Sequence, residues 1–135
     1  MRGGADVETR GIDLTHFDPV IYSGNYHSIG DYLGAIGDFT VGVFKTQEKE
    51  YLANHFSGNF EVVSLHGTIN TLNDEFYCHL HLSAGNEKGE VFGGHLNRAV
   101  VSATCEMVIT IVGGMVDRYF DEQIGLNLFK FTTPE

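Results

Sequence analysis

The residues best suited to chemistry are histidines, two of which are separated by one residue in His79-Leu80-His81. A third, His95, follows after thirteen intervening residues. Residues i and i+2 of a β-strand share a face with Cα atoms roughly 6.5–7 Å apart, so both imidazoles can reach one metal ion at about 2.0–2.1 Å. Three imidazoles would leave one coordination position open, as in a catalytic zinc site. Histidines on the polar face of a strand can also simply be solvated, and the pattern leaves both interpretations open.

Two glutamates form a second candidate group. Glu61 and Glu106 each interrupt an otherwise apolar run. Such a carboxylate could orient a metal-bound histidine or act as a general base for a metal-bound water. The alternative is a solvated or cross-strand polar position. His66 is open to two interpretations as well, because it could face the same cavity as the three histidines or serve a structural purpose.

Alternating polar and apolar residues predict the strands that would position these groups. Residues 76–83 alternate cleanly, with His79 and His81 on the polar face. Residues 59–69 form a second predicted strand, and Asn73-Asp74 between the two is a turn signal, so we expect a hairpin.

The remaining elements are predicted from shorter patterns. A polar loop is expected at 84–89 and a helix somewhere between residues 12 and 33, where Pro19, Gly24 and Gly30 interrupt the amphipathic pattern. Because one face of a sheet must be covered, we expect a helix or a second copy of the chain to cover it. Further strands are expected at 39–44, 91–96 (broken at Gly93-Gly94), 99–112 and 126–131.

Composition restricts the class of partner. The 135 residues carry a formal charge of −10, and no run of Lys or Arg occurs, which opposes direct binding to nucleic acid. No stretch approaches the roughly 20 apolar residues of a membrane helix. The first residues lack the apolar core of a signal peptide, so we expect a cytoplasmic location with Cys78 and Cys105 as reduced thiols.

Several segments together resemble the sequence motifs of one known family. The segment 58–69, Gly-Asn-Phe-Glu-Val-Val-Ser-Leu-His-Gly-Thr-Ile, is similar to a G-x-F-E-[IV]-[LV]-S-L-x-G motif. Residues 79–82 and 91–96 resemble H-x-H-[VL] and V-x-G-G-H-L motifs, and residues 104–109 resemble a T-x-E-[VI]-V-I strand. Residues 34–44 are similar to a glycine-alanine turn and the strand that follows. These are the motifs of the plants-and-prokaryotes conserved (PPC) domain, which the chain resembles.

The resemblance implies an α+β fold, a mainly antiparallel sheet with a helix, assembled as a homotrimer. It places the domain at 34–131, with 1–33 as an atypical N-terminal segment. Some prokaryotic members carry a metal bound by histidines, which would be His79, His81 and His95 here. Prokaryotic members are commonly labelled DNA-binding, but this chain has no AT-hook, since Arg2-Gly3-Gly4 is not an R-G-R-P core.

Three functional hypotheses follow. The first is a trimeric, DNA-associated or regulatory binding module with a histidine metal site and a protein or small-molecule partner. The alternative is a metal-dependent hydrolase for a small polar substrate, in which the three histidines hold zinc and Glu61 or Glu106 deprotonates the bound water. In the third, the metal is purely structural and stabilises the trimer.

Overall fold

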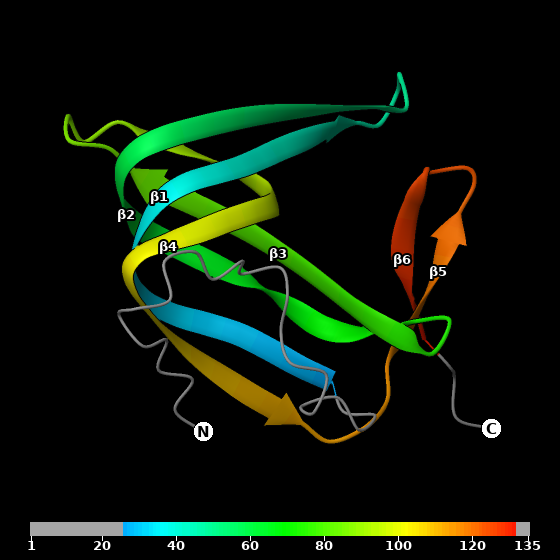
Figure 1. The fold of residues 1–135 in the computed structure, drawn as a ribbon. Helices are drawn as coiled ribbons and strands as arrows, with labels where there is room; N and C mark the ends of the chain where they lie inside the picture. Colours follow the sequence, from blue (N-terminus) through cyan, green and yellow to red (C-terminus); the bar gives the residue numbers. More distant parts are fainter. Residues whose placement is uncertain (1–25, 132–135) are drawn as a thin grey trace.

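Every regular element in the described part of the chain is a β-strand. The computed structural model describes residues 26–131 (Figure 1). These residues form β1 (Tyr26–Lys45), β2 (Glu50–Leu72), β3 (Glu75–Gly85), β4 (Val91–Val112), β5 (Asp117–Asp121) and β6 (Leu126–Lys130). No described segment forms a helix of the length and apolarity needed to cross a membrane.

The first four strands close into a barrel with antiparallel neighbours throughout. Three of the strands are unusually long and curve around the core (Figure 1). Strand β1 pairs with β2 in two stretches, with Ile29 opposite Gly67 near one end and Val43 opposite Leu52 near the other. It also pairs with β4 along its length, and this pairing completes the barrel.

The predicted α+β class is wrong for the described residues, which are all-β. The expected helix between residues 12 and 33 lies partly outside them, and the described part, 26–33, belongs to β1. This segment pairs with β2 on one side and β4 on the other, with His27 opposite both Ile69 and Ile111. Closure gives the sheet an enclosed inner face without a covering helix, because a barrel packs its sheet against itself.

Alternation along the strands separates a buried inner face from a polar outer face. In β3, Leu80, Leu82 and Ala84 are buried, whereas His79 and His81 occupy the alternate positions and point outward. The thirteen buried apolar residues form one cluster: Ile36, Phe39, Val41, Phe60, Val62, Leu65, Ile69, Leu80, Leu82, Ala84, Leu96, Ala99 and Val101.

The predicted hairpin is confirmed. Strands β2 and β3 pair antiparallel across the two-residue turn Asn73-Asp74. Both residues have positive φ, 53° and 64°, as a type I′ turn requires. Asn and Asp tolerate this conformation better than most residues, which is why the pair was a usable turn signal.

One expectation for the C-terminal half is wrong, and one strand was missed. Gly93-Gly94 does not break the chain, because β4 runs continuously through it. The glycines instead permit close strand contact: a Cβ on Gly94 would lie 2.6 Å from the carbonyl oxygen of Gly42, and one on Gly93 would lie 2.6 Å from that of Leu82. Strand β5 was not predicted at all.

Strands β5 and β6 form a separate two-stranded sheet that stands beside the barrel (Figure 1), and β5 contacts β2. The Asn70 amide donates to the carbonyl of Val116 at 3.0 Å, and the Thr71 hydroxyl donates to the Asp117 carboxylate at 2.9 Å. At the far end of the hairpin, the Lys49 ammonium donates to the carbonyl of Ile124 at 2.6 Å. The hairpin is thereby held at both ends.

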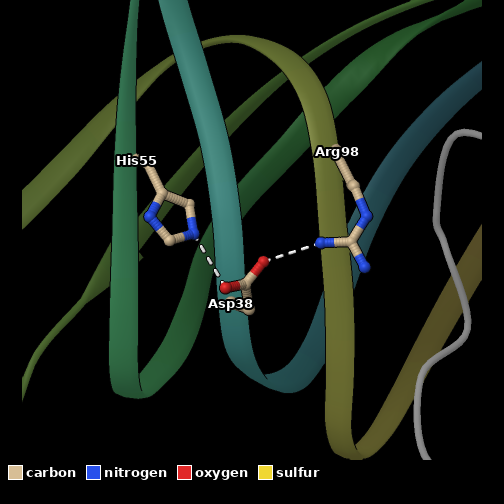
Figure 2. A network of polar contacts seen from close by, with 3 residues as sticks. All are labelled: Asp38, His55 and Arg98. Carbon is tan, nitrogen blue, oxygen red and sulfur yellow. Dashed lines mark hydrogen bonds and ion pairs between the residues drawn. The ribbon is translucent and has the colours of Figure 1, made fainter.

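A small polar network ties three barrel strands together on the outer surface (Figure 2). The Asp38 carboxylate of β1 lies 2.7 Å from Nε2 of His55 on β2 and accepts a hydrogen bond of 2.7 Å from Nη1 of Arg98 on β4. The hydrogen bond with His55 is the main reason that the pKa of Asp38 lies below its usual value. All three side chains are substantially exposed, so solvent screens the attraction and the network contributes little to stability.

We expect Asp38→Asn to lower the free energy of unfolding at pH 7 by only about 0.5 kcal/mol. A lowered acid pKa stabilises the fold above the ordinary value of 3.8, and this contribution is lost as the pH falls through the folded-state pKa. The difference between variant and wild type should therefore shrink below about pH 4. Urea denaturation from pH 7 to 3 measures it, with the exposed-turn variant Glu122→Gln as control. A difference that persists unchanged at pH 3 would contradict this account.

We expect Gly67→Ala to destabilise the barrel by about 1–3 kcal/mol, the usual cost of overpacking. The added Cβ would clash with the carbonyl of His79 and lie 2.8 Å from the Cα of Leu80, and backbone atoms cannot move aside cheaply. Gly113→Ala is the matched control, because no atom lies within 4 Å of its Cβ position. Its change should stay within about 0.5 kcal/mol in the same urea titration. Equal losses of stability in Gly67→Ala and Gly113→Ala would show that the close contact between strands at Gly67 does not cause the effect.

Candidate metal centre

Two neighbouring strands bring the three predicted histidines together. His79 and His81 lie on the outer face of β3, and His95 of β4 is the register partner of His81. Each offers a ring nitrogen, and the three nitrogens lie within 4.8 Å of one another. Nε2 of His79 is 3.2 Å from Nε2 of His81.

Close strand packing holds His95 in place. Gly94, the residue before it, is the register partner of Leu82, and Gly42 of β1 pairs with His95 from the other side. The Tyr51 ring stands edge-on to the His95 ring at 6.0 Å, and its hydroxyl donates to the Asn97 side chain at 2.6 Å. The doubled glycine therefore lets β4 approach both neighbours and present His95 beside β3.

The electrostatics of the cluster favour neutral imidazoles. Burial is the largest cause that lowers the pKa of His79, to about 4, and the positive charges of His95, Arg118 and His81 lower it further. Burial, followed by the charge of His81, also lowers the pKa of His95. A metal binds only the neutral form of imidazole. Because both pKa values are lowered, these two rings need not lose a proton before they bind a metal near neutral pH.

The arrangement fits a tetrahedral ion. Two nitrogens at about 2.0–2.1 Å from one zinc ion in tetrahedral geometry lie roughly 3.4 Å apart. The 3.2 Å spacing of His79 and His81 matches this value. No pair exceeds 4.8 Å, so a ring shift of about an ångström closes the set, well within side-chain freedom. The fourth position would stay open.

The other sequence candidates lie outside this group. His66 of β2 is exposed and is the register partner of His81, so it extends the row of histidines to a third strand. Glu61 is exposed and lines a different cleft, with Asn59 and Glu87. Glu106 is exposed on β4, opposite Leu33. The structure does not bring either glutamate into the histidine cluster, and their catalytic role stays a prediction.

Arg118 is the residue beside the site that sequence reasoning missed. It lies on β5, which was not predicted, and only 6% of its surface is exposed. Its Nη2 donates to Thr68 at 3.2 Å, and Thr68 is the register partner of His79. The available signal was the charged pair Asp117-Arg118 between apolar and aromatic residues, in the segment from Gly114 to Asp121.

A cleft adjoins the cluster where β3 and β4 separate. The two strands pair only from His81 and His95 to Gly85 and Val91. Beyond His95 the gap between them is a cleft of about 330 Å³, lined by Phe76, Tyr77, Cys78, Leu80, His95, Leu96 and Asn97.

Fold and site together define a small antiparallel β-barrel with a histidine cluster on its outer face. A model of the Plants and Prokaryotes Conserved (PCC) domain matches residues 28–113, more than half of the chain. The chain therefore belongs to the family of the plants-and-prokaryotes conserved domain, as its motifs indicated. The predicted limits of the domain, 34–131, stay a prediction.

Solved structures support the same assignment. A metal-containing protein from Archaeoglobus fulgidus is 30% identical with a TM-score of 0.78, covering 90% of this chain and 88% of its own. A plant- and prokaryote-conserved protein from Pyrococcus horikoshii is 27% identical with a TM-score of 0.79, covering 93% and 88%. A "putative DNA binding protein" from Bacteroides thetaiotaomicron is 28% identical with a TM-score of 0.78, covering 84% and 78%. A comparison with curated proteins gives no match.

Proposed function

We propose that this protein is a metal-dependent binding module in which His79, His81 and His95 hold one zinc ion. The observation that carries the proposal is the convergence of three ring nitrogens within 4.8 Å. The similarity to a metal-containing protein from Archaeoglobus fulgidus supports it. Zinc suits three neutral imidazoles, and when bound it supplies a Lewis-acidic position open to a ligand.

A binding role fits the surroundings better than hydrolysis does. A hydrolase needs a base within hydrogen-bond reach of the attacking water. The two glutamates considered for that role, Glu61 and Glu106, lie outside the histidine cluster. The metal-dependent hydrolase remains the alternative, and turnover of small esters, amides or phosphates by the zinc-loaded protein would favour it.

We further propose that the chain works as a cytoplasmic homotrimer with a small-molecule or protein partner. Large apolar side chains at least half exposed in the described residues are Val43, Val63, Val91, Val108, Ile111, Met115, Phe120 and Phe131, and burial of some between copies would be favourable. Both cysteines are free thiols, which suits a reducing compartment. The formal charge of −10 argues against direct contact with DNA, so any DNA association would act through a partner.

We expect protein purified without an affinity tag to contain about one zinc per chain by elemental analysis. The double variant His79→Ala/His81→Ala should lose it, because one imidazole cannot hold the ion alone. His55→Ala is the matched control, since His55 bonds Asp38 on another part of the surface. Unchanged metal content in the double variant would refute the metal centre. Melting curves with and without a chelator then show how far the ion supports the fold.

We expect a solution mass three times the 14.9 kDa of the chain, measured by size-exclusion chromatography with light scattering. Removing the metal with a chelator should leave this mass unchanged if the ion serves binding. If the trimer dissociates on chelation, the structural hypothesis for the metal is the better one. A monomer in the presence of metal would contradict the trimer outright.

A further inference from the structure

Arg118 places a fixed positive charge next to the candidate metal centre. Its Nη2 donates to the hydroxyl of Thr68 at 3.2 Å, and Thr68 stands directly opposite His79 in the sheet. Its guanidinium carbon also lies 5.1 Å from the ring centre of Tyr77, two residues before His79 on the same face of β3. The guanidinium therefore lies against the register partner of His79 and against a residue two positions before it.

The surrounding side chains fix the orientation of this guanidinium. Nε donates to the side chain of Asn70 at 3.2 Å, and Nη1 donates to the carbonyl of Asn127 at 2.8 Å. The ring of Phe129 stacks at 4.0 Å from the guanidinium carbon. Arginine does not lose its proton in a protein, so the guanidinium itself stays charged. A charge held in place beforehand needs no reorganisation when a ligand arrives.

The combined charge selects the kind of ligand that the open position can hold. Three neutral imidazoles leave the full double charge of a zinc ion uncompensated. Arg118 adds a third positive charge, held on Thr68 directly opposite His79. In a half-buried setting such charge strongly favours an anionic ligand over a neutral one. Because Nε, Nη1 and Nη2 already donate to Asn70, Asn127 and Thr68, Arg118 acts on such a ligand through its charge.

The adjoining cleft would accommodate the rest of such a ligand. Its volume of about 330 Å³ is at the lower end of the range for small-molecule sites. Tyr77 belongs both to the cleft and to the surroundings of Arg118, and His95 belongs both to the cleft and to the metal centre. The cleft thus shares one residue with the surroundings of Arg118 and one with the metal centre, and Phe76, Leu80 and Leu96 give it apolar walls.

We propose that the metal centre binds a small organic oxyanion, a carboxylate or a phosphate, whose charged group lies at the open coordination position beside Arg118. The organic body of the ligand occupies the cleft between β3 and β4. Arg118 is a specificity-determining residue that favours anions over neutral ligands. The proposal rests on the proposed metal centre.

The test uses the full-length protein loaded with Co²⁺, whose visible absorption changes with the fourth ligand of a tetrahedral site. Titration with acetate and with inorganic phosphate should change the spectrum at concentrations where neutral acetamide does not. The variant Arg118→Gln should bind the effective anion at least about tenfold more weakly while still taking up Co²⁺. Arg98→Gln is the matched control on the other polar network of the barrel and should behave as wild type.

The outcomes distinguish a failure of the anion proposal from a failure of the proposed metal centre. Failure of the wild-type protein to take up Co²⁺ would refute the metal centre itself. Co²⁺ uptake with no response to either anion, or with equal responses to acetate and acetamide, would refute anion selection alone. A response to phosphate only, or to acetate only, supports the proposal and identifies the oxyanion. Circular dichroism shows whether Arg118→Gln folds. If it does not, two measurements still decide whether the site selects anions: the anion response of Arg118→Lys, which keeps the charge, and the wild-type comparison of acetate with acetamide.

Discussion

The strict alternation of side chains in β3 is the constraint on which the site depends. Leu80, Leu82 and Ala84 must enter the barrel core, so His79 and His81 must point outward. A register slip of one residue would bury the imidazoles and expose the leucines. The hydrophobic cost of that exchange fixes the register of the strand. The same apolar residues that stabilise the barrel thus fix the direction of two metal-ligand candidates.

The position of the third candidate ligand, His95, depends on a contact between strands rather than on alternation alone. His95 reaches the others because it lies opposite His81, and that pairing needs the close approach of β4 at Gly93 and Gly94. A side chain at either glycine would meet a carbonyl oxygen of a neighbouring strand at 2.6 Å. From the sequence, the doubled glycine suggested a break, because glycine weakens a strand interior when nothing else is known.

Local patterns predicted local structure well and failed where the chain closes on itself. The hairpin at Asn73-Asp74 and the outward histidines followed from alternation and turn chemistry, which act over a few residues. Barrel closure depends on pairing between residues far apart, such as Ile36 with both Phe60 and Val101, which periodicity does not encode. The expectation of a covering helix came from treating the sheet as open. Strand β5 was missed because five residues are too few for a clear period.

The missed strand carries the residue that gives the histidine cluster its chemical bias. Three imidazoles alone would bind a divalent ion with little preference for its remaining ligand. The β5–β6 hairpin adds a guanidinium held by Thr68, Asn70 and Asn127, in a place where burial reduces screening by water. Docking of the hairpin on β2 is therefore more than a structural support. It couples the stability of the small sheet to the charge of the site, so that loss of the hairpin would leave the histidines in place and remove the positive charge beside them.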